Sequence, residues 1–243
     1  MWSGRDRPAI EGQSKERALL NYRSRHMSKE LPITERTRLR RKSERGYYDR
    51  ETIDAILDAM PMCHVGYVID GSPVVMPTFQ WREGDHVYWH ASNAGRGLRA
   101  AEGTSVCLTV SLLDGLVLAR TGLNHSANFR SVMIFGQPRK ITEPERKADL
   151  LNGMIDAFYP GRSTILRPMA ESDLKQTALL SLPIEEASAK IRSGGPIDED
   201  EDYALPIWAG TVPVKMQMMP PVPDPRNLDG VEMPEHVTSI KFG

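Results

Sequence analysis

The chain has 243 residues, of which 40% are hydrophobic, so it can bury the core of one large or two small domains. Its net charge of −1 conceals a basic head, because residues 1–45 contain 13 Lys and Arg against 6 Asp and Glu. Such a head is usually a solvated extension, and we do not expect nucleic-acid binding. The sequence contains two cysteines, no apolar leader and no run as long as a membrane span, which indicates a cytoplasmic protein without a disulfide framework.

We expect three parts along the chain. Residues 1–45 form a basic N-terminal extension that is partly disordered, because it offers few apolar anchors. Residues 46–215 form the folded domain. Residues 216–243 form a Pro-rich C-terminal tail.

The first expected element is a helix that begins after Asp49, a suitable N-cap, and ends before Pro61. Residues 63–69 and 73–81 then predict two strands of a hairpin, joined by a turn at Asp70-Gly71. We expect a second turn at residues 82–85 and a later one at Asp114-Gly115.

Later segments alternate between strand and helix patterns. Further strands are expected at residues 86–90, 105–113, 116–120, 130–137 and 178–184. Helices are expected at residues 143–158, with Thr142 as the cap, and at residues 171–176. Short antiparallel strands with helices between the later ones predict an α+β fold that is mainly β, built on a small antiparallel barrel.

Residues 87–98, VYWHASNAGRGL, change from a β-run to a polar loop and then to a helical pattern. The hydroxyl of Ser92, free backbone N–H groups and the planar cation of Arg96 together suit a phosphate monoester. The alternative is an ordinary strand-to-helix connection, in which Gly95 permits the turn and Arg96 is a solvated charge.

The histidines in and beside the strands do not predict a metal site. His86 and His90 are four residues apart on a strand, which separates them by roughly 13 Å. His64 and His125 lie in different segments, and a lone histidine is more often a hydrogen-bonded structural residue than a ligand. They are weak candidates for a catalytic role.

Five blocks, in this order, resemble one family. They are residues 63–78 (CHVGYVIDGSPVVMPT), 87–100 (VYWHASNAGRGLRA), 128–141 (NFRSVMIFGQPRKI), 182–194 (LPIEEASAKIRSG) and 203–214 (YALPIWAGTVPV). The chain resembles the pyridoxamine-phosphate-oxidase-like flavin proteins from about Leu31 to about Arg226. This is the FMN-binding split β-barrel family, and the resemblance is to the flavin-nucleotide-binding branch that includes nitroimidazole-resistance proteins.

The resemblance implies a set of FMN-binding residues. It places the flavin edge at Val75, Met76, Pro77 and Thr78, the end of the next strand at His90, Ala91 and Ser92, and the phosphate at Arg96. Many relatives carry a second cation where this chain has Gly97. Ser131 lies in a block that resembles the segment reaching the flavin of the partner subunit.

The resemblance also implies a homodimer that binds FMN. We expect an FMN-dependent oxidoreductase that reduces a small electrophile of the nitro-compound or quinone type. The C-terminal histidine-arginine motif of the vitamin-oxidising members is absent, which argues against pyridoxamine phosphate as the substrate. The alternative is a non-catalytic FMN- or haem-binding protein of the same fold, with His64 or His125 as an axial ligand.

Overall fold

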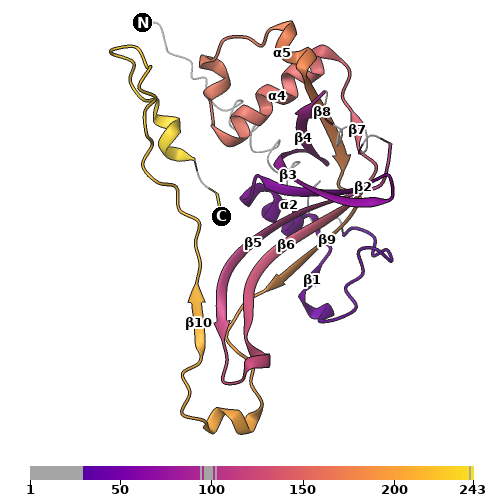
Figure 1. Ribbon diagram of the computed structural model, residues 1–243, viewed down its shortest axis with the longest axis vertical. Coiled ribbons are helices and arrows are strands. Elements are labelled where there is room, and N and C mark those ends of the chain that lie inside the picture. The colour runs from indigo at the N-terminus through magenta and orange to yellow at the C-terminus, as the bar shows by residue number, and fades with distance from the viewer. Residues whose placement is uncertain (1–29, 94, 96–100, 102, 241) are drawn as a thin grey trace, which may run out of the picture.

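A computed structural model describes residues 30–243, apart from residues 94, 96–100, 102 and 241 (Figure 1). The helices are α2 (Arg50–Ala59), α4 (Pro144–Phe158) and α5 (Glu171–Gln176). The strands are β1 (Gly46–Tyr47), β2 (Met62–Ile69), β3 (Ser72–Glu83), β4 (His86–Ser92), β5 (Val106–Leu118), β6 (Ser126–Gly136), β7 (Arg139–Lys140), β8 (Thr177–Pro183), β9 (Glu186–Arg192) and β10 (Gly210–Pro213).

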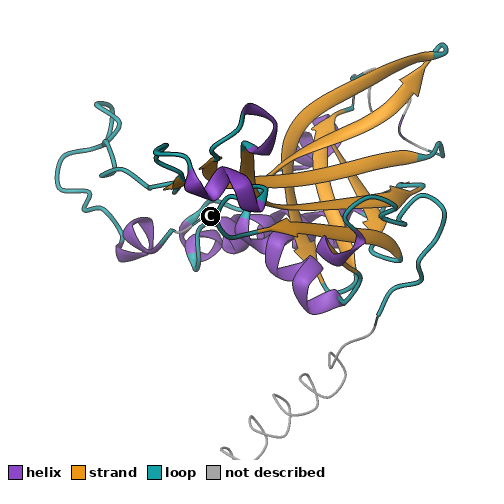
Figure 2. Cartoon of the chain, turned by 90° about the horizontal axis from the view of Figure 1, so that it is seen from below, coloured by secondary structure: helices purple, strands orange, loops and turns teal. Residues whose placement is uncertain are grey.

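The described strands form one antiparallel sheet in the order β1-β9-β6-β5-β2-β3-β4-β8-β7, and β10 pairs with β5 beyond the end of β2. The sheet curls without closing (Figures 1 and 2). This confirms the predicted α+β fold of the split-barrel type.

Two local signals in the sequence produce the structure expected from them. Asp49 Oδ1 accepts a hydrogen bond from the backbone N–H of Thr52 at 2.8 Å, which caps α2. Asp70 and Gly71 both have positive φ, 48° and 78°, and they close the hairpin between β2 and β3. Each signal acts within a few residues, so packing elsewhere does not override it.

The prediction of a turn at Asp114-Gly115 is wrong. Strand β5 runs through this point to Leu118, with a register shift between Leu113 and Gly115 against β6. The dipeptide therefore forms an irregularity within a long hairpin rather than a chain reversal, because pairing with β6 continues on both sides of it.

Three further boundaries differ from the expectation. Strand β6 begins at Ser126, before the expected start at residue 130, and the N-cap residue of α4 is Glu143 rather than Thr142. The sequence does not predict strand β9 in this form, because its residues EASAKIR have no clear alternation. Pairing with β6 defines it over residues 186–192.

The core lies between the inner face of the curled sheet and α2. Ile53, Ile56 and Leu57 of α2 are buried there, together with Leu108 of β5 and Ile134 of β6. A second, smaller cluster packs α4 against the other side of β3, β4 and β8. The two helices therefore stabilise opposite sides of the same strands.

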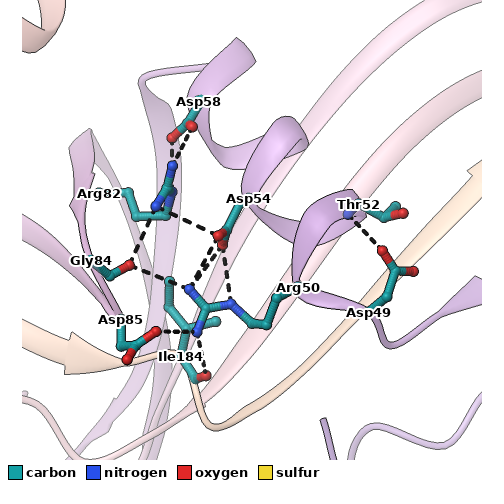
Figure 3. A network of polar contacts seen from close by, with 9 residues as sticks. All are labelled: Asp49, Arg50, Thr52, Asp54, Asp58, Arg82, Gly84, Asp85 and Ile184. Carbon is teal, nitrogen blue, oxygen red and sulfur yellow. Dashed lines mark hydrogen bonds and ion pairs between the residues drawn. The ribbon is translucent and has the colours of Figure 1, made fainter. Parts of the chain in front are cut away.

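The buried side chain of Arg50 links α2 to the β3–β4 turn and to the β8–β9 turn (Figure 3). Arg50 donates to Asp54 Oδ1 at 3.0 Å, to Asp85 Oδ1 at 2.9 Å and to the carbonyl oxygen of Ile184 at 3.5 Å. Burial raises the pKa of Asp54, while Arg82 and Arg50 oppose that rise. This network is structural, since its charges compensate one another inside the fold.

The segments that flank the expected domain also contact it. Leu31 is buried, and Arg36 and Thr34 both hydrogen-bond to Glu186 of β9. At the other end, the backbone N–H of Gly243 donates to the carbonyl of Ala59 at 2.8 Å. The three-part division of the chain stays a prediction.

No helix in the described ranges is both long and apolar enough to cross a membrane.

Candidate functional site

The pleat of β2 and β3 divides the predicted flavin residues between two faces of the sheet. Met76 pairs with Val65, which is buried on the inner face. Val75 pairs with Gly66 and Pro77 pairs with His64, so these residues lie on the opposite, outer face. The consecutive residues 75–78 therefore cannot all line one site within one chain.

A small cavity on the inner face brings together four of the predicted residues. Its lining includes Met76, Thr78, His90 and Ala91, and also Val65, Tyr67, Trp89, Ala101 and Leu180. Its volume is about 20 Å³, room for roughly one water molecule. The cavity can thus form one wall of a ligand site but cannot enclose a ligand.

His90, one of the lining residues, has an unsatisfied polar atom. Its Nδ1 is buried and has no hydrogen-bond partner in the described part of the chain. Burial lowers the pKa of His90, which favours the neutral imidazole. Neutral imidazole presents one donor and one acceptor, so a ligand in this position could satisfy the orphaned nitrogen.

The remaining predicted residues lie elsewhere. Ser92 is exposed at the end of β4, and Arg96 and Gly97 lie outside the described residues. Ser131 lies on β6, where its hydroxyl donates to the carbonyl of Lys190 at 3.3 Å. It pairs with Ser111 and shares the outer face with Val75, so it does not reach the cavity of its own chain.

The two candidate histidines differ in their surroundings. His125 is exposed after the β5–β6 hairpin turn, and its Nδ1 lies 2.8 Å from the carbonyl of Thr121, to which it donates. His64 is exposed on the outer face, between Pro77 of β3 and Thr109 of β5. Its imidazole has no hydrogen-bond partner within the described ranges, which leaves both nitrogens available.

The sheet face around His64 is unusually apolar for an exposed surface. This outer face is defined by its exposed large side chains, Met62, Val68, Val75, Phe79, Leu113 and Met133. Gly66, next to His64 on the same face, adds no side chain there. An exposed apolar surface that includes an imidazole without a partner among the described residues suits a largely apolar ligand.

A second cavity, of about 690 Å³, lies at the edge of β5 beneath the C-terminal segment. It is lined by Met60, Leu113, Asp114, Arg130, Met216 and Phe242, among others. The Nη2 of Arg130 donates to Asp114 Oδ1 at 2.7 Å, and this hydrogen bond raises the pKa of Arg130. Most of the charge in this cavity is therefore already neutralised.

Several cavity residues are not among those predicted from the sequence. Val65 and Tyr67 alternate with His64 on β2, so strict alternation could have assigned them to the inner face. Leu180 comes from β8, which pairs with β4 at Trp89, and no local signal points to that pairing. Among the described residues, no group of three or more His, Cys, Asp or Glu could hold a metal ion.

Comparison with known proteins agrees with this architecture. The family model described as pyridoxamine 5′-phosphate oxidase matches residues 49–191, and the chain belongs to this family. Comparison with curated proteins gave no match.

Two solved structures resemble most of the chain. The flavocytochrome Anf3 from Azotobacter vinelandii is 50% identical, with a TM-score of 0.84 over 86% of this chain and 98% of that one. The FAD and haem binding protein from Mycobacterium smegmatis is 34% identical, with a TM-score of 0.78 over 82% of this chain and 98% of that one. A putative 5-nitroimidazole antibiotic resistance protein from Bacteroides thetaiotaomicron is 22% identical, with a TM-score of 0.51 over 60% of this chain and 86% of that one, and shares the fold.

Proposed function

We propose that this protein is a flavocytochrome-type redox protein, which binds a flavin at the inner-face cavity and a haem on the outer face. The observation that carries the proposal is the inner-face cavity, whose lining includes Met76, Thr78 and His90, together with the unpartnered Nδ1 of His90. It is supported by the flavocytochrome and the FAD- and haem-binding protein, which match over almost their whole lengths.

The flavin implied by the sequence resemblance is FMN, and we propose FAD as the stronger candidate. The support for FAD is the 34% identical protein, which is described as binding FAD. Met76 and Thr78 would contact the flavin, His90 would offer its unsatisfied nitrogen, and Arg96 would bind phosphate. A bound flavin would supply one- or two-electron chemistry, while these residues hold it and limit access.

His64 is the proposed haem ligand. Haem iron is commonly held by the neutral imidazole of a histidine. His64 lies on an apolar face, whereas His125 is exposed beside the turn between β5 and β6. The residues present on the outer face therefore fit the group, with apolar side chains available to cover a porphyrin.

Absorption spectroscopy of the purified protein, reconstituted with FAD, FMN or haem, tests both assignments. We expect His64→Ala to remove the Soret band and to leave the flavin bands, and His125→Ala, the matched control, to change neither. Loss of the Soret band from His125→Ala alone would reverse the ligand assignment. A wild-type protein that takes up no flavin would overturn the proposal.

The phosphate contact is tested separately. Arg96→Ala should weaken flavin binding by about tenfold to a hundredfold, the cost of one charge-assisted hydrogen bond of roughly 1.5–3 kcal/mol. Arg99→Ala, three residues further along the chain, is the control and should bind flavin as the wild type does. Equal losses in a fluorescence titration would remove Arg96 from the site.

We also propose that the protein is a homodimer, since its outer face exposes six large apolar side chains and such exposure favours an interface. Ser131, on that face, would then approach the partner's flavin rather than its own. Reduction of a nitro compound or quinone stays a prediction, tested by oxidation of the reduced flavin upon addition of each class.

A further inference from the structure

The C-terminal arm, residues 214–233, exposes an unusual amount of apolar surface for a segment at the end of a chain. Its exposed large side chains are Val214, Met216, Met218, Met219, Val222, Leu228, Val231 and Met233. Val222 is 91% exposed and Met219 is 73% exposed. Residues 216–223, MQMMPPVP, include no charged side chain, so the composition is unlike that of a solvated tail.

Both ends of the arm are attached to the chain's own body. Just before it, β10 pairs with β5 over residues 115–118, and the N–H of Val214 donates to the carbonyl of Asp114. Beyond it, the ring of Phe242 lies 6.2 Å from that of Phe158. The path of the arm is therefore constrained, although its middle is uncovered.

Between these attachments the arm makes few contacts with the body. Its described backbone hydrogen bonds after Val214 join residues within the arm, such as Asn227 N–H to the carbonyl of Asp224. Figures 1 and 2 show the arm running clear of the sheet in two perpendicular views. Val214 and Met216, at the start of the arm, line the 690 Å³ cavity together with Leu113 of the chain's own outer face, whereas Met219 and Val222 further along the arm are exposed.

We propose that the arm of one protomer packs on the outer face of a second copy of this chain, outside the area around His64 that the proposed haem takes, and that the partner's arm does the same in return. The inference rests on the proposed homodimer and specifies how it is built. One chain carries two uncovered apolar surfaces, the arm and the outer face. In a two-fold symmetric dimer, each arm covers the outer face of the other protomer, so both kinds of surface are buried. A different protein bound to the arm would leave the outer face exposed, and one bound to the outer face would leave the arm exposed.

The chemistry of the arm suits this contact. Four prolines at positions 220, 221, 223 and 225 favour an extended backbone and remove N–H groups that would otherwise need partners. The methionines at 216, 218 and 219 are flexible and adapt to an irregular apolar surface. Side chains rather than backbone pairing would therefore hold the arm against the outer face.

Analytical ultracentrifugation of the full-length protein gives the first test. The double variant Met219→Asp/Val222→Asp should raise the dimer dissociation constant by about a hundredfold, because it places two charges in an apolar contact. Both side chains are exposed in a single chain, so circular dichroism should remain unchanged. Leu123→Asp is the control, since Leu123 is 98% exposed and lies on neither surface.

Photo-crosslinking gives the second test. A photoreactive amino acid at position 222 is placed in ¹⁵N-labelled chains, which are mixed and equilibrated with unlabelled chains. We expect labelled arm peptides joined to unlabelled peptides from β2, β3 or β5. Crosslinks confined within single chains, or a dimer unaffected by the double variant, would overturn the proposal.

The outcome for the flavin is measured independently. A monomeric wild-type protein that retains flavin bands would overturn the arm contact and the homodimer, and would leave the flavin proposal standing. A dimer that crosslinks as expected but takes up no flavin would overturn only the flavin proposal.

Discussion

Both faces of the hairpin formed by β2 and β3 carry hydrophobic side chains, yet the two faces differ in what covers them. On the inner face, Val65 and Cys63 are buried by α2 and the curled sheet, and burial raises the pKa of the Cys63 thiol to about 12. On the outer face, His64, Val68 and Val75 are exposed. Hydrophobic content by itself therefore does not indicate which face forms the core.

The side chains of one short motif are divided between these two faces. Because successive residues of a strand point to opposite faces, Met76 and Thr78 line the inner cavity while Val75 and Pro77 adjoin His64. We therefore propose that residues 75–78 combine contacts to an inner ligand with contacts to an outer ligand or a partner. Three pairs of substitutions test the assignments made to these faces.

The largest expected effect is on folding. Leu108→Ala and Leu113→Ala change the same residue type on the same strand, but Leu108 is fully buried whereas Leu113 is exposed on the outer face. We expect Leu108→Ala to lower the free energy of unfolding by about 2–5 kcal/mol and Leu113→Ala by less than about 1 kcal/mol. Urea denaturation at low protein concentration measures both, and equal losses would contradict the assignment of the faces.

The second effect is on flavin binding. Met76→Trp places a bulky side chain in the inner cavity, and we expect it to weaken flavin binding at least about tenfold, or roughly 1.4 kcal/mol. Val75→Trp makes the same kind of change one residue away on the opposite face and should leave the flavin affinity within about twofold. A titration of each variant with flavin, monitored by flavin fluorescence, measures both affinities. Equal losses would indicate that Met76 and Val75 belong to one flavin site.

The smallest effect is the pH dependence of stability that arises from His90. Burial lowers the pKa of His90 in the folded protein, so below the unfolded value of about 6.5 the unfolded chain binds the proton more readily. The contribution of neutral His90 to stability is therefore present above about pH 6.5 and declines as the pH falls through that value. Melting temperatures between pH 5 and pH 8 should show this slope in the wild type.

Two variants identify the source of the slope. His90→Gln should flatten the decline at low pH, because it removes the titrating ring, while His125→Gln should preserve it. A slope that persists unchanged in His90→Gln would exclude His90 as the group responsible.

Several local features of the fold can be predicted from the sequence. Asp49 caps α2, Asp70-Gly71 closes the first hairpin, and the alternation of residues 63–69 fixes a strand. These features depend on neighbours a few residues away, so the local chain determines them. The resemblance in five ordered blocks also led to the family and its α+β fold.

Other features of the fold and of the candidate site depend on tertiary contacts. It paired β4 with β8, which brings Leu180 to the cavity beside Trp89, and it left His64 free while His125 bonds to Thr121. It also carried β5 through Asp114-Gly115, where local propensity favours a turn. These outcomes depend on contacts between segments far apart in the chain, where burial and long-range strand pairing outweigh local preference.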